Sequence, residues 1–213
     1  MRRKIAALLG AVTFVAIAAP AGAAPAVVER VPMSWHAQSG NPHGSPVAEG
    51  ATAKLVRTEN GISYSIQTEQ LNPGHAYTVW VVVVNNPAAC TVRPCSPPVD
   101  IIGNPETESQ VTYGGGHVVG ASGQAGFGGS VQLGPIPQGW LPDQGLTDPL
   151  GAEVHLVLND HGPVIAELMP EMIQTYRAGC TDESLPAIFP ATAKADGTPG
   201  PNTCRLWQLA VFG

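Results

Sequence analysis

Charged side chains are scarce in this sequence. Asp, Glu, Lys and Arg make up 12% of its 213 residues, whereas 25 residues are glycine and 21 are proline. Glycine and proline both interrupt helices, so this composition excludes a coiled coil or a bundle of long helices. The chain is neither strongly charged nor poor in Val, Leu and Ile, which excludes intrinsic disorder. The composition therefore predicts a loop-rich globular β protein.

Basic residues are fewer than acidic ones, 10 against 16. Three of the basic residues are Arg2, Arg3 and Lys4, so the chain beyond them has a formal net charge of −9. Such a chain offers no basic surface for nucleic acid or anionic lipid, and both are excluded as partners. Aromatic residues make up only 6% and are scattered, which gives no stacking platform for bases or carbohydrate.

Only one long hydrophobic run is present, and it lies at the start of the chain. It extends from Ile5 to about Ala19, follows the basic cluster and precedes the small residues Ala21-Gly22-Ala23. This pattern is typical of a cleaved secretory signal, and the run is shorter than the ~20 residues that span a bilayer. The sequence thus predicts a signal peptide over residues 1–23 and a secreted, extracellular protein with no membrane insertion after cleavage.

Four cysteines follow the predicted signal: Cys90, Cys95, Cys180 and Cys204. In an oxidising compartment an even number of cysteines indicates disulfides, and four cysteines allow three pairings. We favour Cys90–Cys95 and Cys180–Cys204, because each pair brackets a loop rich in proline or glycine. A zinc site built from these cysteines is the weaker alternative, because no C-x-x-C pair is present.

The remaining sequence predicts short strands. Residues 24–50 contain four prolines and predict an irregular lead-in, with at most one short strand near residues 31–36, to a single β domain over residues 51–213. Asn60-Gly61 predicts a hairpin between strands at 53–58 and 62–68. The unbroken run Trp80–Val84 predicts a central strand buried on both faces. Further strands are predicted at 109–113, 117–121, 124–133, 153–158 and 205–212.

One helix is predicted, between Val164 and Arg177, with Pro170 at the start of its regular part. Together these elements predict an all-β fold, a mostly antiparallel β-sandwich or Greek-key barrel with one short helix near the C-terminal third.

The common catalytic motifs are absent, including G-x-S-x-G, H-E-x-x-H and the phosphate-binding loop. Histidine is the polar residue that can converge on a site, since all six histidines follow the predicted signal. Glu153 and His155 stand two apart on a predicted strand and share one face, and His161 and His117 lie near strand ends. The sequence therefore predicts a candidate copper or zinc site formed by His117, His155, His161 and Glu153.

Two other interpretations use the same polar face. Ser122 or Ser130 can be paired with a histidine as nucleophile and base, with Asp160 orienting the imidazole, but no spacing selects such a set. The face can instead line a ligand pocket above a floor of Val and Leu. The leading hypothesis is a secreted binding module for a small ligand or a protein partner, and the alternative is a metal-binding protein or metal-dependent enzyme.

Four segments carry a resemblance to known proteins. The sequences at residues 74–80, 85–90, 116–120 and 151–156 resemble a group of exported bacterial proteins of unassigned function, over a span from about Leu55 to Phe212. The turn and strand over residues 71–80 are also similar to chordin-type (CHRD) domains, which are β-sandwiches like the copper/zinc superoxide dismutases. The resemblance implies a β-sandwich. It carries over no catalytic residue, because the His-x-His pair on which both families rely is absent.

Overall fold

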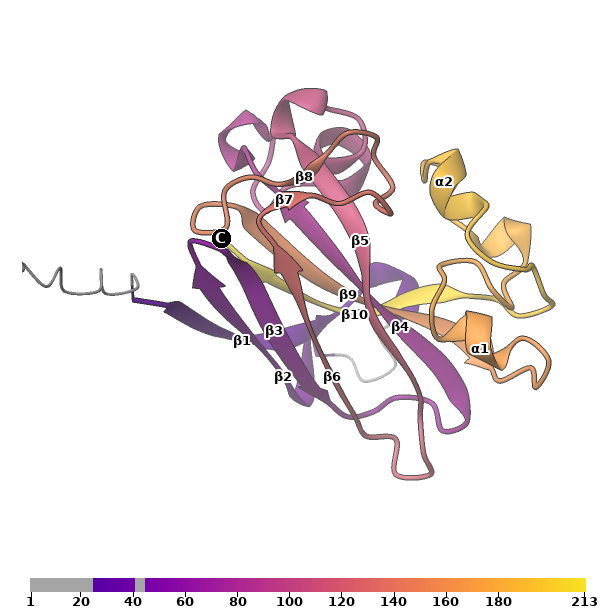
Figure 1. The fold of residues 1–213 in the computed structure, drawn as a ribbon. Helices are drawn as coiled ribbons and strands as arrows, with labels where there is room; N and C mark the ends of the chain where they lie inside the picture. Colours follow the sequence, from indigo (N-terminus) through magenta and orange to yellow (C-terminus); the bar gives the residue numbers. More distant parts are fainter. Residues whose placement is uncertain (1–24, 41–44) are drawn as a thin grey trace, which may run out of the picture.

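The computed structural model describes residues 25–40 and 45–213, and the predicted signal peptide lies outside these ranges. Its main feature is one large, nearly closed antiparallel sheet of eight strands (Figure 1). The strand order is β5-β4-β9-β10-β1-β2-β3-β6. The strands are β1 Val27–Trp35, β2 Val47–Thr58, β3 Gly61–Thr68, β4 His75–Val84, β5 Ser109–Val118, β6 Ala125–Gln132, β9 Glu153–Pro163 and β10 Arg205–Phe212.

Shorter elements occupy the connections. A two-stranded pair, β7 Gly134–Pro135 and β8 Gly145–Leu146, lies between β6 and β9. The helical turns are η1 Ala37–Ser39, η2 Pro87–Ala89, η3 Pro97–Ile101, η4 Pro105–Thr107, α1 Met169–Met172, η5 Asp182–Ser184 and α2 Ala191–Lys194. The all-β fold with little helix is therefore confirmed.

The predicted hairpin is present as β2–β3, where Thr58 pairs with Gly61 across a two-residue turn. The run from residue 80 to 84 lies in β4, which has β5 and β9 as its neighbours. Alternate residues of β4 enter two different cores. Val79, Val81 and Val83 belong to the inner core, enclosed by the curved sheet, whereas Trp80 and Val82 belong to the outer core, which covers the sheet's convex face. A strand buried on both faces needs such an unbroken hydrophobic run.

Two elements differ from the sequence predictions. The lead-in over residues 24–50 is not irregular, because it contains β1, which pairs with both β10 and β2. The predicted helix from Val164 to Arg177 is reduced to α1. The backbone amides at its two ends bond elsewhere, Val164 to the Gly74 carbonyl and Arg177 to the Asp196 carbonyl, so tertiary pairing replaces helical hydrogen bonds there.

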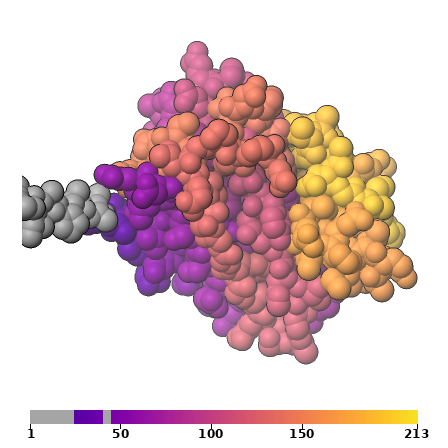
Figure 2. Space-filling model, in the orientation of Figure 1, coloured from indigo at the N-terminus to yellow at the C-terminus, as the bar shows by residue number. Residues whose placement is uncertain are grey.

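The outer face of the sheet is covered by two long connections. Residues 164–204, between β9 and β10, form a continuous block along one side of the molecule, orange to yellow in Figure 2. Residues 85–108, between β4 and β5, lie at one end of the sheet (Figure 1). We refer to them as the C-terminal excursion and the β4–β5 loop.

Glycine is required where β5 and β6, the two ends of the sheet order, approach each other. A Cβ atom on Gly129 would lie 3.0 Å from the Gly114 carbonyl oxygen and 2.7 Å from the Tyr64 hydroxyl. On β5, a Cβ on Gly116 would lie 1.9 Å from the Ile173 carbonyl oxygen of the C-terminal excursion. The glycine-rich sequence therefore allows the sheet to close almost completely, and it allows the C-terminal excursion to pack closely against β5.

This contact gives a test. We expect Gly116→Ala to lower the free energy of unfolding by about 2 kcal/mol, because the methyl group meets backbone that cannot turn aside. Gly120→Ala is the matched control, since a Cβ there has no heavy atom within 4 Å. Urea denaturation of both variants measures the difference, and equal stabilities would show that the excursion does not pack against β5 as described.

Candidate functional site

A pocket of about 490 Å³ lies in the outer core, between the sheet and its two covering connections. Aliphatic side chains of β4, β9 and β10 form its floor. One wall is the proline-rich part of the β4–β5 loop, residues 94–102, and another is the C-terminal excursion. The floor side chains are Val82, Val157, Leu206, Leu209 and Val211. We call this space the outer pocket.

Four aromatic residues form one side of the outer pocket: Trp80, Trp140, Tyr176 and Phe189. Their ring centroids lie 4.8 to 5.3 Å apart wherever they are in contact, and all four side chains are buried. Because the rings fill the space between one another, they make a rigid apolar wall rather than an open cage. The indole nitrogen of Trp140 is buried without an acceptor among the described residues.

The wall formed by the β4–β5 loop is fixed by covalent and polar contacts. The disulfide Cys90–Cys95 closes the loop, as predicted, and Cys95 lines the pocket. Asp100 is buried and accepts hydrogen bonds from the amides of Thr91 and Ser96. These bonds hold the pKa of Asp100 below its ordinary value. The disulfide and these hydrogen bonds thus fix the conformation of the wall.

Glu153 connects this wall to the sheet. Its Oε1 accepts hydrogen bonds from the Cys95 amide (2.7 Å) and from His155 Nε2 (2.7 Å), and its Oε2 lies 3.3 Å from Arg93 Nη1. Burial opposes ionisation of Glu153, but the hydrogen bonds from His155 and the Cys95 amide outweigh it, and the pKa lies below its ordinary value. Glu153 is therefore a carboxylate at neutral pH, and it orients the His155 ring.

Polar side chains are few in the outer pocket. Among the described residues they are His36, Gln38, Ser96 and His155, together with the hydroxyl of Tyr176, and no Asp, Glu, Lys or Arg is included. His36 Nδ1 accepts the Gln38 amide hydrogen, and Gln38 Oε1 accepts the Leu206 amide hydrogen, so both side chains have local partners. Burial lowers the pKa of His36. The chemistry of the site is that of an apolar cavity with isolated hydrogen-bonding groups.

The structure brings together two of the four predicted metal ligands, Glu153 and His155. His161 lies six residues beyond His155 on β9, which is about 20 Å along a strand. His117 pairs across the sheet with Tyr77 of β4, whose side chain belongs to the inner core. His161 instead forms a hydrogen bond with Thr78, whose side chain lies on the opposite face of β4. His117 is exposed, with its ring edge against Phe127. His117 and His161 therefore lie outside the outer pocket.

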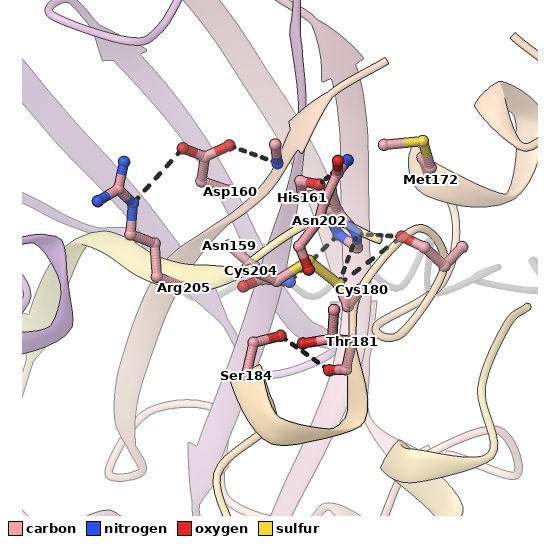
Figure 3. The surroundings of a disulfide bond; sticks show 12 residues. Asn159, Asp160, His161, Met172, Cys180, Thr181, Ser184, Asn202, Cys204 and Arg205 are labelled. Carbon is pink, nitrogen blue, oxygen red and sulfur yellow. Dashed lines mark hydrogen bonds and ion pairs between the residues drawn. A yellow bond between two sulfur atoms is a disulfide. The ribbon is translucent and has the colours of Figure 1, made fainter. Parts of the chain in front are cut away.

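His161 lies against the second disulfide, Cys180–Cys204, which also has the predicted pairing (Figure 3). Its ligand atoms and those of the two cysteines are within 4.8 Å of one another, the only such group with three members among the described residues. Each sulfur is bonded to the other, so neither is a thiolate available to a metal ion. In this oxidised form the cluster is a structural support.

The imidazole of His161 is held by polar contacts on both sides. Nδ1 donates to the Ala178 carbonyl (2.9 Å), and Nε2 accepts from the Thr78 hydroxyl (2.8 Å). The ring is fully buried, which lowers the pKa of His161 to about 4. His161 is therefore neutral at physiological pH and joins β9 and β4 to the C-terminal excursion.

The aromatic wall was not predicted from the sequence. Trp140 lies between β7 and β8, and Tyr176 and Phe189 lie in the C-terminal excursion. Neither connection shows periodicity, and only the fold brings these residues to Trp80. The sequence did contain one indication of this wall, the hydrophobic residues Trp80, Val82 and Val84 of β4. A strand that is buried on both faces requires a second layer to cover it. Ser122 and Ser130, the candidate nucleophiles, do not line the outer pocket.

Two disulfides account for all four cysteines. None of the helices in the described ranges has the length and apolar character of a membrane span. The disulfides are compatible with an extracellular protein. Comparison with known proteins adds no relative: no family model, no curated protein and no solved structure matches this chain.

Proposed function

We propose that this protein is an extracellular binding protein that holds a small, mainly apolar molecule in the outer pocket. The observation that carries the proposal is the pocket itself, about 490 Å³ of space walled by buried aromatic and aliphatic side chains. Pockets for small molecules have volumes of roughly 300–1,000 Å³ and few polar groups, and the outer pocket has both properties.

The way the pocket is built supports binding over simple packing. A cavity of this size in a core costs stability, because its lining atoms lose contacts that a filled core would make. Here both walls belong to segments closed by disulfides, and Glu153 ties one wall to the floor. A preformed site of this kind loses little conformational entropy on binding.

The apolar dye N-phenyl-1-naphthylamine tests the proposal. We expect it to bind the wild-type protein with enhanced fluorescence and to be displaced by other apolar molecules. Leu209→Trp should weaken dye binding at least about tenfold, because the half-exposed Leu209 lines the pocket and the larger indole occupies its space.

Val28→Trp is the matched control, because Val28 is 54% exposed on β1 and lies outside the pocket. This variant should bind the dye as the wild-type protein does. Absence of dye binding to the wild-type protein, or equal affinity of the two variants, would falsify the assignment of the outer pocket as a binding site.

A further inference from the structure

His155 is a buried histidine of the outer pocket, and one of its two ring nitrogens is uncommitted. It is 4% exposed and lines the pocket. Its Nε2 is taken by Glu153 at 2.7 Å, and its Nδ1 makes no hydrogen bond with any residue in the described ranges. The Nδ1 atom is also not among the buried atoms sealed from solvent without a partner. The pocket is therefore the space from which Nδ1 can be reached.

The Glu153 carboxylate determines which ring nitrogen of His155 carries the hydrogen. A carboxylate only accepts hydrogen bonds, so the nitrogen facing it must carry the hydrogen. In neutral imidazole the hydrogen of His155 is therefore on Nε2, and Nδ1 has a free lone pair. The free group in the pocket is a hydrogen-bond acceptor, fixed in place by the Glu153 carboxylate, the Cys95 amide and the strand β9.

We propose that the ligand of the outer pocket is an uncharged hydrocarbon-rich molecule bearing a hydroxyl group, which donates its hydrogen to Nδ1 of His155. This inference rests on the proposed function and specifies the ligand class of that site. The apolar body of the ligand packs against the aromatic wall and the aliphatic floor. A single hydroxyl satisfies this free acceptor, which otherwise stays without a partner once the ligand excludes water.

The charges around the site exclude the other common head groups. A ligand carboxylate would meet the lone pair of Nδ1, with the Glu153 carboxylate directly behind the ring. An ammonium group would need an anionic partner, but no acidic side chain lines the pocket, and Glu153 is covered by His155, the Cys95 amide and Arg93. Burying an unpaired charge costs far more than an apolar body gains. A hydroxyl avoids both penalties.

A matched pair of bicyclic probes tests this inference on the wild-type protein alone. 2-Naphthol carries the hydroxyl donor, whereas 2-methoxynaphthalene has the same ring system and no donor. At neutral pH we expect 2-naphthol to bind about fivefold to tenfold more tightly, as measured by displacement of N-phenyl-1-naphthylamine. Equal affinities, or a preference for the methyl ether, would overturn the inference.

Variants assign the preference to one residue. His155→Phe keeps a ring of similar size and removes the acceptor, so the two probes should bind it equally. His36→Phe is the matched control, because His36 also lines the pocket but its Nδ1 already accepts the Gln38 amide hydrogen. This variant should keep the preference for 2-naphthol. Loss of the preference in His36→Phe with retention in His155→Phe would reassign the hydroxyl to His36 and overturn the role of His155.

The outcomes separate this inference from the proposed function. If neither naphthalene derivative nor the dye binds, the outer pocket is not a binding site and both proposals fail. If all three bind but the hydroxyl makes no difference, the binding function stands and only the ligand class is wrong.

Discussion

Removal of the disulfide Cys180–Cys204, by the double substitution to alanine, lowers the free energy of unfolding by about 3 to 4 kcal/mol. The two cysteines are 24 residues apart, and a cross-link closing a loop of that length removes this much conformational freedom from the unfolded chain. The bond also ties Cys180, in the middle of the C-terminal excursion, to Cys204, the residue before β10, so its loss opens the loop that supplies Phe189 to the outer pocket. Urea denaturation measures the loss.

The other disulfide is the control. Cys90 and Cys95 are only five residues apart, so replacing both with alanine costs less, about 2 kcal/mol in the same chain-entropy account. The Cys180/Cys204 double variant should also bind N-phenyl-1-naphthylamine less tightly than the wild-type protein. Equal losses of stability in the two double variants would show that loop closure is not the main contribution of Cys180–Cys204.

Acidification from pH 6.5 to 4 removes about 3 kcal/mol of folding stability through His161. Burial lowers the pKa of His161 from 6.5 to about 4 in the folded protein. Between these values the unfolded chain binds a proton that the folded chain does not, so the free energy of unfolding falls as the pH falls. Each unit of pKa difference corresponds to about 1.4 kcal/mol, which gives the total.

Comparison of two variants separates the contribution of His161 to the pH dependence of stability from that of the carboxyl groups that titrate in the same pH range. His161→Gln should be less stable at pH 7, because it disturbs the contacts with Thr78 and Ala178. Its stability should nevertheless fall less steeply than that of the wild-type protein between pH 6.5 and 4.5. The exposed His117, changed to Gln, should leave the wild-type slope unchanged. A wild-type slope in His161→Gln would mean that His161 is not held neutral by burial.

The strands that could be predicted from the sequence are those whose signal is local. From Ile62 onward β3 alternates between buried and exposed residues, and β4 ends in the unbroken hydrophobic run Val79–Val84, so each shows its environment in its own residues. Only the second half of β1 was anticipated, as a short strand near residues 31–36, because Pro32 interrupts the pattern and most of the side chains of β1 are not fully buried. Its strand conformation is set by β2 and β10, its partners on either side.

In the candidate site, too, only the features with a local signal could be predicted. The Glu153–His155 pair could be predicted, because residues two apart on a strand share a face. The wider metal cluster depended on distance along and across the sheet, which the sequence does not contain. The aromatic wall likewise depends on how residues 140, 176 and 189 are delivered by connections without periodicity. Strand partners, faces and covering loops are properties of the whole fold, and they decide which histidines meet.

The position of β1 between β10 and β2 constrains how the protein reaches its native state. Ser34 pairs with Leu209, so the first and last strands of the described chain are neighbours in the sheet. Contacts between residues so far apart in sequence form slowly, because a long loop must close before they stabilise anything. This pair cannot form until the last strand has been synthesised. A nascent chain therefore cannot complete the eight-stranded sheet, and the edges of β1 and β9 that β10 occupies stay unpaired until residues 205–212 have been added.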